Sequence, residues 1–81
     1  MTMDEIRAYL PRVKTWNIQR NDHPWGYAII SQSYNLDATE ITINRNDGTE
    51  VAYIRHNGLL SEEMAHDVIM QYLVTTEAFY D

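Results

Sequence analysis

The chain has 81 residues and a mass of 9.5 kDa, which is the size of one small domain. It has no cysteine, which excludes disulfide scaffolds, thiolate metal clusters and cysteine catalysis, and its net charge is −6. No apolar run approaches the ~20 residues of a membrane-spanning helix, and the first residues lack the basic-then-apolar order of a signal peptide. We therefore expect a single domain over residues 1–81 that lies in the cytoplasm and does not bind membranes.

The first residues predict a short helix. Thr2 and Glu5 have the spacing of a capping box, in which each side chain satisfies a backbone N–H of the other. Ile6 and Leu10 recur at helical spacing. Pro11 disfavours helical geometry at the residue before it, so the predicted helix ends or kinks near residue 10.

Residues 14–20 allow two interpretations. Trp16 and Ile18 alternate with polar residues, which favours a short strand. The spacing between Val13 and Trp16 also fits a continued helix, so both interpretations stay open and the strand is preferred. The cluster 21–24, Asn-Asp-His-Pro, then predicts a turn.

Three further segments alternate with the period of a β-strand: residues 25–34, 39–44 and 50–55. In the first of these we expect Trp25, Tyr27 and Ile29 to share one face. Between the last two, Asn46-Asp47-Gly48 predicts a hairpin turn, because glycine adopts positive φ at no steric cost.

The last helix is predicted from Ser61 to about Thr75. Ser61 is a good N-cap, and acidic residues in the first turn suit the helix dipole. Its apolar stripe consists of Ala65, Val68, Ile69, Tyr72 and Leu73. A meander of strands exposes an apolar face that helices must cover. The fold class is therefore predicted as α+β in two layers, with a three- or four-stranded antiparallel meander flanked by an N-terminal and a C-terminal helix.

The acidic excess is confined to the second part of the chain. Residues 1–45 carry five acidic and five basic residues, whereas residues 46–81 carry seven acidic residues against Arg55 alone. An acidic surface keeps a protein soluble, which is the commoner explanation, or attracts a basic partner. The segregation of the charges favours a partner. A helix over 61–77 is ~25 Å long, and a DNA strand of that length carries about seven phosphates, so a DNA mimic also needs Asp47 and Glu50 on the same surface.

No residue pattern points to catalysis or to a bound metal. His23, His56 and His66 do not have the i,i+4 spacing of a helical zinc site. The serines lie outside any Gly-x-Ser-x-Gly motif, and the adjacent Glu62 and Glu63 diverge by about 100° on a helix. We expect a protein that is not an enzyme and that holds no cofactor.

The segment 39–54, Thr-Glu-Ile-Thr-Ile-Asn-Arg-Asn-Asp-Gly-Thr-Glu-Val-Ala-Tyr-Ile, resembles the central hairpin of small phage-encoded anti-CRISPR proteins that inhibit type II Cas9. The predicted order of elements, the size and the acidity are also similar to that group. The resemblance implies a protein that binds the guide-loaded nuclease and covers the site that reads the short motif beside its DNA target. It further implies that Asp47 and Glu50 occupy a pocket of Lys and Arg side chains.

We therefore expect an inhibitor that blocks a nucleic-acid-binding site on a larger basic protein, with these partner-binding residues: Asp47, Glu50, Glu62, Glu63, Asp67 and Tyr80. A Cas effector nuclease is one such partner, and direct binding of nucleic acid is not expected. One alternative is an accessory or assembly protein of a phage or bacterium, which forms a homodimer through a strand edge or the Phe79-Tyr80 tail. A third interpretation is a single-strand binder that uses Trp16, Trp25 and Tyr27.

Overall fold

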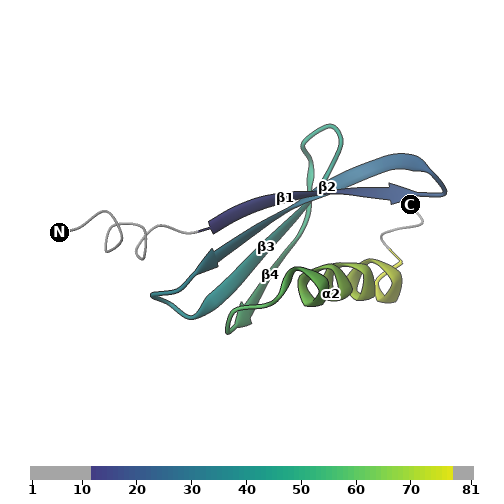
Figure 1. Ribbon diagram of the computed structural model, residues 1–81. Coiled ribbons are helices and arrows are strands. Elements are labelled where there is room, and N and C mark those ends of the chain that lie inside the picture. Colours follow the sequence, from purple (N-terminus) through teal and green to yellow (C-terminus); the bar gives the residue numbers. More distant parts are fainter. Residues whose placement is uncertain (1–11, 78–81) are drawn as a thin grey trace.

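The computed structural model describes residues 12–77, which form a four-stranded sheet and one helix (Figure 1). The elements are β1 (Arg12–Arg20), β2 (His23–Ser33), β3 (Ala38–Arg45), β4 (Glu50–Asn57) and α2 (Glu62–Thr75). Neighbouring strands pair antiparallel in the order β1-β2-β3-β4. The α+β class and the antiparallel meander are confirmed, with four strands. The helix predicted over 2–10 lies outside the described residues.

The sheet and α2 form two layers, with α2 lying along one face of the sheet (Figure 1). Between the layers lies a single core of buried apolar side chains: Ile18, Trp25, Ala28, Ile30, Ile41, Ile43, Ala52, Leu60, Ala65, Ile69 and Leu73. Within residues 12–77 no second element covers the opposite face of the sheet, and no helix is long and apolar enough to cross a membrane.

The segment 14–20 belongs to a nine-residue strand, so the strand interpretation is confirmed and the helical alternative is wrong. The turn after it is shorter than predicted, because Asn21 and Asp22 both adopt positive φ (51° and 64°) and close a two-residue hairpin. Pro24 therefore lies inside β2. It pairs with Gln19 where the register shifts, a position at which a missing N–H is tolerated.

The prediction that Trp25 shares a face with Tyr27 and Ile29 is wrong. Ile18 pairs with Gly26 and the next residue of β1 pairs with Pro24, so Trp25 is the extra residue of a β-bulge. The bulge turns its side chain into the core, where it is 5% exposed, whereas Tyr27 and Ile29 stay half-buried.

The hairpin between β3 and β4 forms as predicted, with Gly48 at φ 88°. The backbone N–H of Arg45 donates to the Thr49 carbonyl at 2.9 Å, and the Thr49 N–H donates to Oδ1 of Asp47 at 2.9 Å. The side chain of Asn44 is polar and yet buried, at 8% exposed. Its carbonyl lies against Gly26, where an added Cβ would stand 2.2 Å from the Asn44 oxygen. Only glycine fits that position.

Thr39 connects the sheet to the start of α2. Its side chain is fully buried, and its hydroxyl donates to the Gly58 carbonyl at 2.9 Å and accepts from the Leu60 N–H at 3.1 Å. Gln32 reaches the same loop, since its amide donates to the Leu60 carbonyl. These bonds satisfy buried backbone groups that would otherwise lose their water, and they fix where the helix begins.

The helix begins and ends as predicted. The Ser61 hydroxyl accepts from the Met64 N–H at 3.2 Å and caps the first turn, and the helix ends at Thr75. Ala65, Ile69 and Leu73 are buried against the sheet. The remaining two members of the predicted apolar stripe, Val68 and Tyr72, are half-buried at the side of the helix.

Candidate interaction surfaces

The carboxylates predicted to bind a partner lie in two groups at opposite ends of β4. Asp47 and Glu50 lie in the β3–β4 turn and at the start of β4, and Glu62 begins α2 beyond its far end. The strand has eight residues, which span about 25 Å at about 3.3 Å per residue. In Figure 1 the β3–β4 turn projects above β1 and β2, whereas α2 lies below them. The five carboxylates therefore do not form the single surface that a DNA mimic needs.

Two carboxylates share the outer face of α2. Glu63 and Asp67 are exposed and four residues apart, which places them on neighbouring turns of the same side. Asp67 also lies two residues from the buried Ala65 and Ile69, so it points away from the sheet. Large apolar side chains accompany the two acids, since Met64 and Val74 are 55% and 48% exposed. No Lys or Arg occurs in α2.

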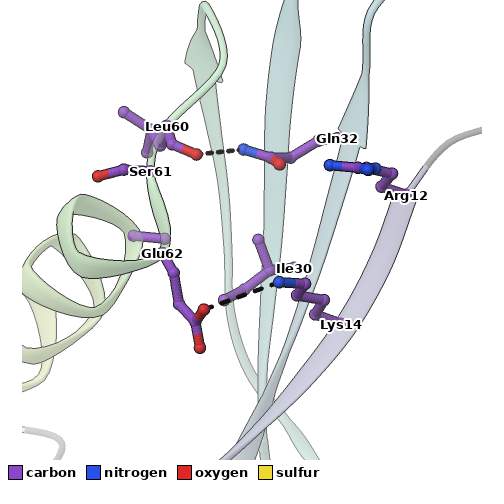
Figure 2. Close-up of a pocket in the computed structure, with 8 residues that line it drawn as sticks. Arg12, Lys14, Ile30, Gln32, Leu60, Ser61 and Glu62 are labelled. Carbon is purple, nitrogen blue, oxygen red and sulfur yellow. Dashed lines mark hydrogen bonds and ion pairs between the residues drawn. The ribbon is translucent and has the colours of Figure 1, made fainter.

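Glu62 differs from its neighbours because it has a cationic partner. Its carboxylate lies 3.7 Å from the Lys14 ammonium of β1, and both side chains are about two-thirds exposed (Figure 2). Exposed pairs of this kind contribute little to stability, about 0–1 kcal/mol. The pair nevertheless reduces the charge that Glu62 offers to a partner. The aromatic contact predicted at Tyr80 lies outside the described residues.

The pocket between β1, β2 and the start of α2 is small. Arg12, Lys14 and Gln32 line it from the sheet, and Ser61 and Glu62 close it from the helix (Figure 2). Its volume is about 50 Å³, which suits a few water molecules rather than a substrate. The Glu62 carboxylate points into the same space as the Lys14 ammonium and balances its positive charge.

The three aromatic side chains considered for single-strand binding do not form one platform. Trp16 stacks on His66 of α2, with ring centroids 3.9 Å apart and planes inclined by 13°. Trp25 is in the core, with the guanidinium of Arg45 4.7 Å from its ring centroid. Tyr27 is opposite Asn17 and lies on the face of the sheet away from α2. Stacking of successive bases on all three is therefore excluded by their positions.

A second hollow lies along the other edge of the sheet, between β4 and α2. This β4–α2 groove is open to solvent and has a volume of about 580 Å³. Its walls are formed by Tyr53, Ile54, Arg55, Val68, Gln71, Tyr72, Thr75 and Thr76. The sequence predicted Val68 and Tyr72 only as members of the apolar stripe of the helix. Only Ala65, Ile69 and Leu73 of the apolar stripe are buried against the sheet. The extra width of the stripe, at Val68 and Tyr72, is the sequence signal for the groove.

Groups that could hold a metal ion do not converge in the part of the chain that the structure describes. His23, His56 and His66 belong to three different elements, and no three His, Asp or Glu side chains between residues 12 and 77 are placed to hold a metal ion.

Comparisons of the chain with family models, with curated proteins and with solved structures find no match.

Proposed function

We propose that the chain is a non-enzymatic inhibitor that binds another protein through the outer face of α2. The observation that carries this proposal is the composition of that face, where Glu63 and Asp67 lie beside the exposed Met64 and Val74. Apolar side chains supply buried contact area, and carboxylates select a partner with Lys and Arg at the matching positions.

A nucleic-acid-binding site is the basic surface that best suits such a helix. Proteins hold phosphates with Lys and Arg side chains, so their binding sites attract carboxylates as well. The inhibitor would cover part of the site with one helix, rather than copy the phosphate row of a strand. This narrower hypothesis depends only on the carboxylates of α2, and it requires no contact from Asp47 or Glu50.

The resemblance of residues 39–54 to anti-CRISPR proteins makes a guide-loaded type II Cas nuclease the first partner to test. The immobilised chain should retain the nuclease, and duplex DNA that carries the target and its adjacent motif should release it. Retention that DNA does not reduce would contradict the proposed mode of inhibition. No retention of this nuclease, or of other DNA-binding proteins offered in the same way, would contradict the proposed function.

Two carboxylates in the turns of the sheet provide a matched control for the carboxylates of α2. The double variant Glu63→Gln/Asp67→Asn removes two carboxylates from the outer face of α2. Asp22→Asn/Asp37→Asn removes the same charge from exposed positions with φ of 64° and 46°, which asparagine tolerates. Retention should fall for the first variant and persist for the second.

A further inference from the structure

We propose that β4 and the adjoining side of α2 form the interface of a symmetric homodimer, in which the β4 strands of two copies pair antiparallel. The inference is independent of the proposed inhibition, because the outer face of α2 takes no part in it. It concerns the β4–α2 groove, to which no role has yet been assigned.

The first observation is an edge strand beside an apolar hollow. β4 is the last strand of the sheet and has a described neighbour only in β3. The backbone groups on its outer side are therefore a template for another strand. Directly beside this edge, Ile54, Val68 and Tyr72 present half-buried apolar surface to the groove. A strand that pairs with β4 would cover both the backbone groups and this apolar surface.

The second observation is the near absence of charge around the groove. The chain carries a net charge of −6, so most of its surface repels a second copy. Of the eight residues that line the groove only Arg55 is charged. The acids of α2 lie elsewhere: Glu62 reaches Lys14 of the opposite edge strand, and Asp67 points away from the sheet. Depletion of charge with enrichment in aromatic residues is typical of the core of a homodimer interface.

The two edges of the sheet differ in a way that selects β4. The outer strand β1 carries Arg12, Lys14 and Arg20, so antiparallel pairing of two β1 strands would bring cations together. Basic residues on an edge strand are a common device against pairing. β4 has one acidic and one basic residue, Glu50 and Arg55, and lacks that protection.

A two-fold axis at Ile54 gives a self-complementary register. Residues directly opposite each other in an antiparallel pair lie on the same face, so this axis places Tyr53 opposite Arg55 of the second copy. The Tyr53 hydroxyl donates a hydrogen bond to the Glu40 carboxylate within each chain. The guanidinium of the second copy therefore meets a tyrosine ring and a carboxylate, and the contact occurs twice. The two Ile54 side chains meet on the α2 side, between the two grooves.

The product would be a continuous eight-stranded sheet with both α2 helices on the same face. The residues Glu63 and Asp67 stay exposed in each copy, so the dimer displays two acidic helices. A partner with two basic sites, or with two copies of one site, would bind such a dimer more tightly than a monomer because the second contact is intramolecular.

Sedimentation of the full chain, from about 10 µM to about 500 µM, tests the association directly. We expect a mass of twice 9.5 kDa at the upper concentrations. Val68→Lys places an ammonium in the groove and should raise the dissociation constant at least tenfold. Val74→Lys makes the same change on the outer face of the same helix and should leave the constant unchanged. A monomeric wild-type chain, or a dimer that survives Val68→Lys, would overturn the proposal.

A cysteine pair tests the register, and it decides the matter if Val68→Lys fails to fold. The chain has no native cysteine, so Ile54→Cys introduces a single thiol on the proposed axis. Two such residues on paired strands lie within disulfide range. Ile54→Cys should form a covalent dimer under mild oxidation much faster than Thr15→Cys, which lies exposed on β1. Equal rates for the two variants would overturn the proposed pairing. Because both assays use the isolated chain, their failure leaves the inhibition hypothesis standing.

Discussion

Replacing Thr39 by valine should cost about 2 kcal/mol of the free energy of unfolding, although the side chain keeps its shape. The hydroxyl donates to the Gly58 carbonyl at 2.9 Å and accepts from the Leu60 N–H at 3.1 Å. Both contacts are between β3 and the loop that starts α2. The variant therefore tests whether this hydroxyl fixes the helix on the sheet.

The magnitude follows from three contributions. The bond to the Gly58 carbonyl is worth about 1 kcal/mol net, and the buried Leu60 N–H without its acceptor costs about 1–3 kcal/mol. The added methyl group returns about 1 kcal/mol through burial of apolar surface. Removal of the weaker 3.4 Å bond from Gln32 adds little. For a domain of this size about 2 kcal/mol corresponds to a melting temperature lower by roughly 10 °C.

Urea unfolding followed by circular dichroism measures the effect. Thr42→Val is the matched control, because it makes the same change three residues away on β3, at a half-buried site on the uncovered face of the sheet. That variant should stay within about 0.5 kcal/mol of the wild type. If Thr39→Val and Thr42→Val have equal midpoints and equal m-values, the loop is not held by this hydroxyl and the reasoning fails.

Three further perturbations have predicted signs. Gly26→Ala should destabilise the fold by at least about 3 kcal/mol, because the new Cβ would stand 2.2 Å from the Asn44 carbonyl oxygen; a melting temperature near the wild-type value would contradict this. Ser61→Ala removes the N-cap of α2 and should cost about 1 kcal/mol in urea unfolding, with no loss in Ser61→Asp as the control. Hydrogen bonds from the Thr49 side chain and backbone lower the pKa of Asp47 below its ordinary value of 3.8. A lowered pKa stabilises the fold above pH 3.8, and this contribution is lost as the pH falls below 3.8 through the folded-state pKa. On acidification the wild type should therefore lose more thermal stability than Asp47→Asn, and parallel curves would refute this.

The sequence predicted the local elements well where one rule dominated. Alternation at Ile41 and Ile43 and a glycine at residue 48 were sufficient for the β3–β4 hairpin, and Ser61 with its apolar stripe was sufficient for α2. The predictions were wrong where a local irregularity interrupted the two-residue alternation of a strand. The bulge opposite β1 turned Trp25 into the core, and it depends on how β1 and β2 pair across the sheet.

The candidate surfaces were less predictable because surface position depends on packing. Asp47 and Glu63 both belong to the acidic second part of the sequence. In the structure, β4 lies between them and separates them in space. The ion pair of Lys14 could not be predicted from the sequence of β1 alone. Its partner Glu62 comes near only because the chain folds back over the sheet at the start of α2. Likewise, helical spacing does not distinguish an apolar residue that faces the core from one that lines the groove, as Val68 does.

Displacement of DNA from a basic partner tests the central claim, that the outer face of α2 carries the binding. Fluorescence anisotropy of labelled duplex DNA on the guide-loaded nuclease should fall as the wild-type chain is added. With the charge-matched variant Asp22→Asn/Asp37→Asn the displacement curve should be unchanged. With Glu63→Gln/Asp67→Asn it should require about tenfold more protein, since two contact charges at about 0.7 kcal/mol each are lost. Superimposable curves for the two double variants would contradict the assignment of binding to α2.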